Sequence, residues 1–248
     1  MLYIKKKSPP SEMLRKVSEI KSTPEWKKIN VGDTRAIRDQ FEALPKDAIR
    51  KSLLEEQHYL CAYCMHKIEN NPLRTSIEHW YPLSKDKEMA LDYNNMLAVC
   101  DGGENWKGKE KKNLCCDAFK ADEAELKISP LNKRQMEKIT YTKDGFIKTE
   151  PQDQRMDEEI RDVLRLNGIW KNDKFLADTT TGLVKGRKDA YQRYEDFIKR
   201  LGKKGRCTSA QVKKKIDEIE TADEWLEYAG VILYFLNKKY QSLVKRGL

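Results

Sequence analysis

The fold is decided by a stretch that runs through Cys61-Ala-Tyr-Cys64, Ile77-Glu-His-Trp-Tyr-Pro82, Met96-Leu-Ala-Val-Cys100 and Cys116-Asp-Ala-Phe-Lys120. All three histidines and five of the six cysteines of the chain lie between residues 58 and 116. The two apolar runs are short and favour strands, and good helix formers follow the last cysteine. The pattern therefore predicts a cysteine knuckle, a strand, a loop, a second strand and a helix.

The cysteines predict a metal site. Two thiolates at C-x2-C spacing can bind one zinc ion, which takes four ligands in a tetrahedral arrangement. Cys61 and Cys64 supply the first two, and Cys100 with one of Cys115 and Cys116 can complete a four-thiolate structural site. The alternative is a pair of buried thiols behind a helix. In a chain without a secretion signal, cysteines more often bind metal than form disulfides.

Glu78 and His79 lie between the two halves of this pattern. Neighbours on a strand point to opposite faces, so the carboxylate can hold a metal while the imidazole faces a water molecule. The alternative is a surface glutamate beside a packed histidine.

The order of these parts resembles the HNH nuclease family, which has a zinc-bound ββα-metal finger. The matching positions are Cys61, Cys64, Glu78, His79, Asn95, Cys100, Cys116, Asp117 and Lys120. The resemblance implies that His79 is the general base and that Glu78 and Asp117 hold one catalytic ion, Mg²⁺ or Mn²⁺. It also implies that Asn95 holds the loop that presents His79, that Lys120 meets a phosphate, and that the cysteines bind structural Zn²⁺.

The chain departs from the family pattern between its last two zinc cysteines. Fifteen residues separate Cys100 from Cys116, where the family usually has two. We expect Cys116 to be the ligand because Asp117 and Lys120 then fall into the family register, with Cys115 as the alternative. The insertion contains four lysines, which can contact a nucleic-acid backbone or belong to a solvated loop. They are Lys107, Lys109, Lys111 and Lys112.

A further resemblance, over about residues 50 to 190, is to HNH endonucleases of the retron and Septu anti-phage systems. The segments that carry it are Leu53-Leu-Glu-Glu-Gln57, Leu91-Asp-Tyr-Asn-Asn95, Tyr141-x-x-Asp-Gly145, Val163-Leu-Arg-Leu-Asn167 and Arg187. It implies a nuclease effector that cleaves DNA and works beside an ATPase subunit of the ABC/SMC type.

Composition agrees with a nucleic-acid partner. The 248 residues include 49 Lys and Arg against 40 Asp and Glu, a net charge of +9. A basic balance favours an acidic partner, although it can also be a solvated surface. The longest apolar run, Ala229 to Leu236, is far shorter than the roughly 20 residues of a membrane helix. With no signal peptide at the start, we expect a cytoplasmic protein without membrane contact.

The overall expectation is a mainly helical α+β protein with the finger embedded between helical regions. We expect a helical arm over 1–50, the nuclease domain over 51–126, and a hairpin plus helical domain over 127–248. Asp144-Gly145 predicts a tight turn in a β-hairpin over 138–149. Thr34 and Thr221 are the expected caps of two helices, the second through a capping box with Glu224.

Two competing functions remain open at this point. An RNA nuclease, including one that cuts transfer RNA, fits the same residues because the finger contacts backbone rather than bases. A zinc-ribbon adaptor that binds nucleic acid or the ATPase without cutting is the alternative from another class. Glu78, His79 and Asp117 together argue against the adaptor, since it needs none of them.

Overall fold

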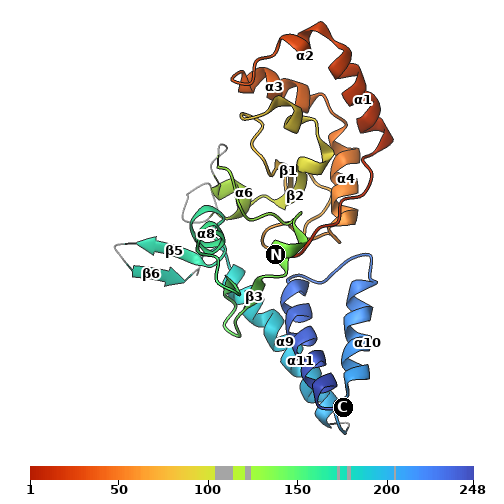
Figure 1. Ribbon diagram of the computed structural model, residues 1–248, viewed down its shortest axis with the longest axis vertical. Coiled ribbons are helices and arrows are strands. Elements are labelled where there is room, and N and C mark those ends of the chain that lie inside the picture. Colours follow the sequence, from red (N-terminus) through yellow and green to blue (C-terminus); the bar gives the residue numbers. More distant parts are fainter. Residues whose placement is uncertain (104–113, 121–123, 172–173, 178–179, 204) are drawn as a thin grey trace.

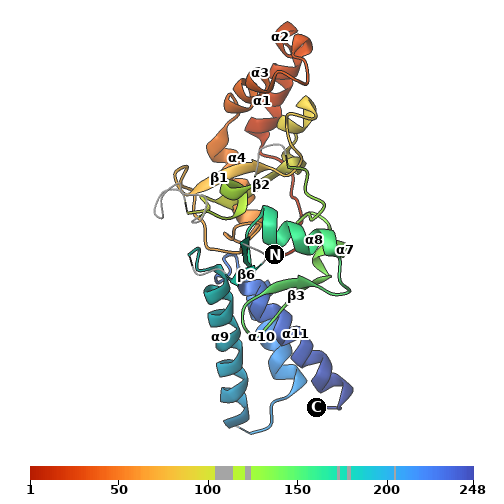
Figure 2. The same cartoon turned by 90° about the vertical axis from the view of Figure 1, so that its left-hand side faces the viewer.

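A computed structural model describes residues 1–103, 114–120, 124–171, 174–177, 180–203 and 205–248. The molecule is elongated, with the N-terminal helices at one end, short strands in the middle and three long helices at the other end (Figures 1 and 2). The fold is α+β and mainly helical, as predicted. The four lysines of the insertion, at positions 107, 109, 111 and 112, lie outside the described residues.

The first half of the chain contains four helices followed by the two strands and short helix of the expected finger. Its elements are α1 (Ser11–Ser22), α2 (Pro24–Lys28), α3 (Thr34–Glu42), α4 (Lys46–Glu56), β1 (Thr75–His79), η1 (Lys87–Ala90), η2 (Tyr93–Asn95), β2 (Met96–Cys100) and α6 (Cys116–Phe119). The second half begins with short elements and ends in long helices. Its elements are α7 (Lys133–Met136), β3 (Ile139–Tyr141), β4 (Ile147–Thr149), α8 (Gln154–Glu158), the π-helix η4 (Glu159–Val163), β5 (Gly168–Lys171), β6 (Lys174–Ala177), α9 (Leu183–Lys203), α10 (Ser209–Glu220) and α11 (Ala229–Lys245).

The strands form three separate two-stranded antiparallel sheets within the described residues. In the first, β1 pairs with β2 so that Glu78 lies opposite Leu97 and His79 opposite Met96. The second sheet, β3 with β4, confirms the predicted hairpin. The third, β5 with β6, was not expected from the sequence.

Two predicted details of the N-terminal helices are wrong. The cap of α3 is Asp33, whose side chain accepts a hydrogen bond from the backbone of Ala36, and Thr34 is already the first helical residue. The apolar positions Ile49, Leu53 and Leu54 predict a helix over Lys46 to Tyr59. Helix α4 instead ends at Glu56, because His58 and Tyr59 adopt left-handed backbone angles, with φ of 52° and 61°. These two residues turn the chain directly into the cysteine knuckle.

The start predicted for the last helix is also wrong. Thr221 is the C-terminal cap of α10, and α11 begins only at Ala229. The intervening backbone is held by contacts with the knuckle: Trp225 donates to the carbonyl of His58, and Tyr228 donates to the carbonyl of Met65. A capping box is a local signal, and these long-range hydrogen bonds override it.

The chain does contain a capping box at the start of α10. The side chain of Thr208 accepts from the backbone of Gln211, and the Gln211 side chain accepts from the backbone of Thr208. This pair satisfies two of the backbone N–H groups that a helix leaves unpaired at its start.

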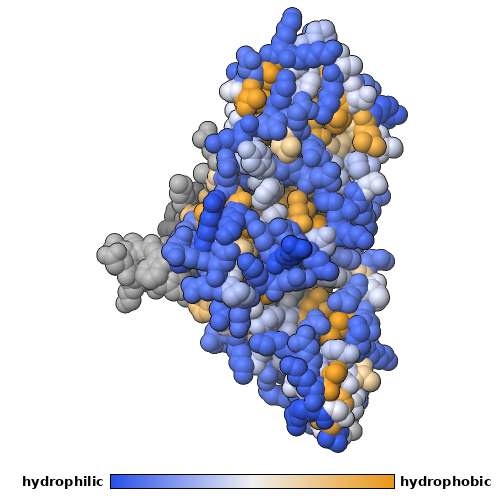
Figure 3. All heavy atoms as spheres, in the orientation of Figure 1, coloured by the Kyte–Doolittle hydropathy of each residue, from blue (hydrophilic) through white to orange (hydrophobic). Residues whose placement is uncertain are grey.

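The main apolar core is continuous along the molecule and includes residues from Met1 to Leu243. The N-terminal arm, the finger and the C-terminal helices therefore pack on shared apolar residues, and the face seen in Figure 3 is mainly hydrophilic. Among the described helices, none has the length and apolar character needed to cross a membrane.

Candidate metal centre and active site

The first part of the site is a tight turn that places the thiols of Cys61 and Cys64 side by side. Met65 donates to the carbonyl of Cys61 at 3.0 Å, and Cys61 donates to the carbonyl of His66 at 2.9 Å. The backbone N–H of His66 also points at the Cys64 sulfur, at 3.4 Å. Met65 takes a left-handed φ of 64°, which closes the turn.

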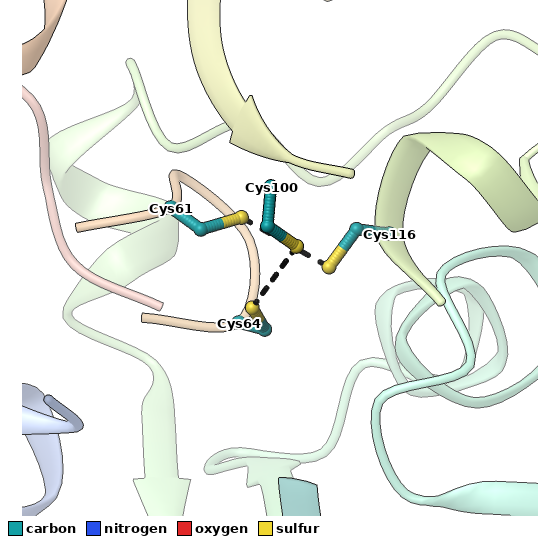
Figure 4. A group of neighbouring side chains, drawn as sticks. All are labelled: Cys61, Cys64, Cys100 and Cys116. Carbon is teal, nitrogen blue, oxygen red and sulfur yellow. Dashed lines mark hydrogen bonds between the residues drawn. The ribbon is translucent and has the colours of Figure 1, made fainter. Parts of the chain in front are cut away.

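Four thiols meet at one buried point (Figure 4). The sulfur atoms of Cys61, Cys64, Cys100 and Cys116 all lie within 4.8 Å of one another. Cys61 and Cys116 are 4.0 Å apart, and Cys64 and Cys100 are 3.7 Å apart. Zinc–sulfur bonds of about 2.3 Å in a tetrahedron place neighbouring sulfurs about 3.8 Å apart. The cluster therefore fits a zinc ion in both ligand type and spacing.

The fourth member is Cys116, not its neighbour. Cys115 is buried, but its thiol is directed at the carbonyl of Gly102, 3.7 Å away. Gly102 has a φ of 59°, and a Cβ there would come within 2.4 Å of the Cys115 carbonyl oxygen. This close approach brings the end of β2 against the start of α6, and Cys116 enters the cluster with a φ of 55°.

The thiols also differ in acidity. Burial alone would raise the pKa of Cys61, but hydrogen bonds from Cys100, Cys116 and Cys64 outweigh it and hold its pKa well below the ordinary value. The pKa values of Cys100 and Cys116 lie well above the ordinary value, with contacts to the neighbouring thiols as the leading cause. Without a cation the cluster thus favours one thiolate, and a divalent ion stabilises the others.

Next to this cluster is a cavity of about 120 Å³, which can hold several water molecules. It is lined by residues from α3, β1, the loop after β1, and the α6 region. They are Arg38, Phe41, Glu42, Ile77, Glu78, His79, Pro82, Leu83, Asp117 and Lys120. Neighbours on a strand were expected to point to opposite faces, yet Glu78 and His79 line the same cavity. His79 is the last residue of β1, where the strand ends.

His79 is held in a defined orientation. Its Nε2 lies 3.1 Å from the carbonyl oxygen of Ala90, and its ring packs edge-on against Phe41, with centroids 4.4 Å apart. Because a carbonyl oxygen only accepts, Nε2 must carry the hydrogen, which leaves the lone pair on Nδ1. Burial lowers the pKa of His79 to about 4, so the imidazole is neutral at pH 7 and can accept a proton.

Asn95 fixes two segments of the chain that follow His79. Its amide nitrogen donates to the carbonyls of Tyr81 and Met89, at 2.9 and 3.0 Å, and its amide oxygen accepts from the backbone of Tyr81 at 2.7 Å. The first loop follows His79 directly, and the second leads to Ala90, the hydrogen-bond partner of His79. Asn95 thus connects the segment after His79 with the segment that orients the His79 ring.

Glu78 is the most perturbed carboxyl group of the cavity. Tyr63 donates to its Oε1 at 3.3 Å, and the ammonium group of Lys120 forms an ion pair with the same oxygen. Burial and the neighbouring charge of Asp117 raise the pKa of Glu78 well above its usual range, against the opposing effect of Lys120. Two carboxyl groups in one cavity are suited to a divalent cation, which prefers oxygen ligands.

The cavity and the cluster are not equally tight. The donor atoms of the four thiols all lie within 4.8 Å of one another, and no other group of three or more His, Cys, Asp or Glu side chains among the described residues is as tight. Glu78, His79 and Asp117 share a cavity without meeting that criterion. Lys120 is directed inward to Glu78, so its contact with a phosphate stays a prediction.

Sequence reasoning missed the positive charges and the aromatic groups around the imidazole. Lys46 and Arg38 come from the N-terminal helices, and with Lys120 they act on His79 electrostatically. Lys46 lies over the Phe41 ring at 3.2 Å. No signal in the cysteine and histidine motifs points to these residues, because α3 and α4 precede the finger and reach the cavity only through packing.

Comparison with known proteins gives no assignment: no protein-family model matches the chain, and no curated protein matches it at a significant level.

Proposed function

We propose that this protein is a metal-dependent endonuclease that hydrolyses phosphodiester bonds of DNA. The observation that carries the proposal is the shared cavity: the neighbours Glu78 and His79 and the distant Asp117 line one space of about 120 Å³ beside a four-thiol cluster. A carboxylate pair with a neutral imidazole is the donor set that water activation at a phosphate requires.

In the proposed reaction, one water molecule is added across a P–O bond. Nδ1 of His79 accepts a proton from the water, whose oxygen forms a bond to phosphorus. The bond from phosphorus to the leaving sugar oxygen breaks, and that oxygen takes a proton from solvent. The Ala90 carbonyl keeps Nδ1 available by holding the hydrogen on Nε2. The negative charge of a bound phosphodiester raises the pKa of the imidazole and so favours the proton transfer.

The metals have separate roles in this proposal. The soft thiolates of Cys61, Cys64, Cys100 and Cys116 suit Zn²⁺, which holds the end of β2 and the start of α6 in place. Glu78 and Asp117 suit Mg²⁺ or Mn²⁺, which neutralises the negative charge that develops on the phosphate when it is bound there. A zinc-supported ββα-metal finger between helical regions is the architecture that we propose on this basis.

The charges near His79 favour an anionic substrate. Lys46, Arg38 and Lys120 all act on the imidazole electrostatically, so the surroundings of the cavity carry positive charge. The net charge of +9 adds long-range attraction for a polyanion. RNA has the same backbone charge, and an RNA nuclease, including one acting on transfer RNA, stays the alternative substrate class.

The biological setting rests on the resemblance alone. It favours the nuclease effector of a Septu or retron type anti-phage system, with an ABC/SMC-type ATPase as partner. Co-expression with an ATPase of that type, followed by size-exclusion chromatography, tests the partnership. Separate elution of the two proteins, with and without ATP, would contradict it.

The activity is tested by incubating the purified protein with plasmid DNA, single-stranded DNA and transfer RNA in Mg²⁺ or Mn²⁺. We expect DNA cleavage that stops when EDTA removes the ion, and that Glu78→Gln and Asp117→Asn reduce strongly. Binding of DNA without cleavage, in the presence of the ATPase as well, would instead support the zinc-ribbon adaptor. Cleavage of RNA alone would move the assignment to the RNA nuclease.

A further inference from the structure

Two protein donors, the Tyr63 hydroxyl and the Lys120 ammonium, contact the Glu78 side chain on the same oxygen. The hydroxyl of Tyr63 donates to Oε1 at 3.3 Å, and the Lys120 ammonium also contacts Oε1. Asp117 shares the cavity, and its side chain is within hydrogen-bonding reach of the same carboxyl group. Both of these donors are on Oε1, so an ion held between Glu78 and Asp117 would meet Glu78 through Oε2.

We propose that Tyr63 and Lys120 are positioning residues that hold Glu78 by Oε1 and direct Oε2 to the catalytic ion, with opposite effects on its affinity. Tyr63 orients the carboxylate without competing for it. Lys120 orients the carboxylate too, but its positive charge opposes the arrival of a second cation. This inference rests on the proposed function and names two residues that set the ion affinity of that site.

Tyr63 is suited to this role by its place in the chain. It lies between the two knuckle cysteines, Cys61 and Cys64, and its side chain is fully buried. The knuckle turn fixes the backbone of Tyr63, so the position of its hydroxyl follows from the four-thiol cluster. Tyr63 thus connects the zinc site to the catalytic carboxylate through one side chain.

Lys120 is suited to the opposing role by its burial and charge. Its side chain is 3% exposed, so the interaction of its ammonium with nearby charges is screened little by solvent. The ammonium already compensates part of the negative charge of Glu78 and Asp117. This positive charge repels a divalent ion that enters the cavity. The site therefore binds the ion more weakly than the same two carboxylates would without the lysine.

The test measures Mn²⁺ binding to the zinc-loaded full-length protein by isothermal titration calorimetry. Tyr63→Phe removes only the hydroxyl, and Lys120→Gln keeps a donor while it removes the charge. Tyr93→Phe is the matched control, because its hydroxyl is bonded to Ser52 at 2.8 Å rather than to a cavity carboxylate. Zinc content and thermal unfolding of each variant report whether the fold is retained.

We expect Tyr63→Phe to bind Mn²⁺ about tenfold more weakly than wild type, because loss of a group that orients a metal ligand costs about 10- to 100-fold in affinity. Tyr93→Phe stays within about twofold, as expected for a change away from such groups. Lys120→Gln binds Mn²⁺ about tenfold more tightly, because a like charge near the ion is removed.

Equal Mn²⁺ affinity of Tyr63→Phe and Tyr93→Phe would overturn the inference for Tyr63. Unchanged or weaker Mn²⁺ binding by Lys120→Gln would overturn the inference for Lys120. If one of these two variants does not fold, the other still tests the role of the residue that it replaces. The proposed function is judged separately by DNA cleavage. Mn²⁺ binding with these differences but without cleavage contradicts only the function, and cleavage without these differences contradicts only the inference.

Discussion

The adjacent pair Cys115 and Cys116 allows the metal centre to be tested with two nearly identical changes. Cys116→Ser removes a thiol from the four-sulfur cluster, whereas Cys115→Ser removes a thiol that is directed at the Gly102 carbonyl. Both residues are buried, so the two variants lose similar apolar contacts. A difference in zinc content between them therefore reports which thiol binds the ion.

The expected size of the difference follows from the geometry. The sulfur separations of 3.7 and 4.0 Å bracket the value of about 3.8 Å for tetrahedral zinc, so all four thiols can bind with little rearrangement. Structural zinc sites contribute about 10–16 kcal/mol of apparent binding free energy, so one of four ligands accounts for about 3 kcal/mol. Cys115→Ser leaves the four cluster thiols in place, so its cost is that of altered thiol hydrogen bonds, about 1 kcal/mol each.

The assay combines zinc content with the free energy of unfolding from denaturant titration. We expect Cys115→Ser to retain about one zinc ion per chain, and Cys116→Ser to lose most of its zinc and several kcal/mol of stability. Equal zinc content in the two variants, or zinc loss in Cys115→Ser alone, would refute the assignment of the fourth ligand.

Three further predictions follow from the site and the fold. Asn95→Ala removes three hydrogen bonds from the loops beside His79. We expect the kcat of cleavage to fall by about 10- to 100-fold while the zinc content is unchanged. An unchanged kcat contradicts the role of Asn95. Burial lowers the pKa of His79 from 6.5 to about 4 in the folded protein, so the unfolded chain takes up a proton at this residue first as the pH falls. The free energy of unfolding is therefore unaffected by His79 above pH 6.5 and decreases by up to about 3 kcal/mol as the pH falls toward 4. His79→Gln should remove this contribution, and urea titrations at pH 7 and pH 4.5 measure it; an identical pH dependence in both proteins contradicts the burial of a neutral imidazole. Thr208→Ala removes the capping box of α10 and should lower the free energy of unfolding by about 1 kcal/mol. A smaller loss for Thr208→Ala than for Thr221→Ala would contradict the assigned caps.

Local patterns predicted the centre of the fold well. The second strand, Met96–Cys100, lies where the apolar run placed it, and Asp144-Gly145 lies in the turn of the predicted hairpin. The first strand was predicted over Ile77 to Pro82 and instead spans Thr75–His79, two to three residues earlier. In each case the signal lies within about ten residues, so the sequence contains all the interactions that decide the outcome.

Features that depend on tertiary contacts were missed or mistaken. The start of α11 is displaced because Trp225 and Tyr228 bond to the knuckle, more than 160 residues away for both pairs. The preference for Cys116 came from motif register, and the close approach at Gly102 explains it physically. Arg38 could not be linked to the cavity by spacing, since only the packing of α3 brings it there.

The inward position of Lys120 was also beyond the reach of the pattern. The family resemblance implies a Lys120 side chain that meets a phosphate. Helix α6 is only four residues long and ends at Phe119, so Lys120 continues in extended backbone, with ψ of 139°, and its ammonium pairs with Glu78. The length of a helix, which local propensity predicts poorly, thus decides what this lysine meets.

The central claim is that the imidazole of His79 performs hydrolysis in a cavity that zinc only supports. The most direct measurement compares the DNA cleavage rates of His79→Ala and His66→Ala, two histidine variants of the same finger. His66 is outside the cavity and pairs with Glu227 at 3.1 Å. We expect His79→Ala to lose at least about 100-fold in kcat, with zinc content and fold intact, and His66→Ala to cleave as the wild type does. Wild-type cleavage by a folded His79→Ala protein would contradict the account.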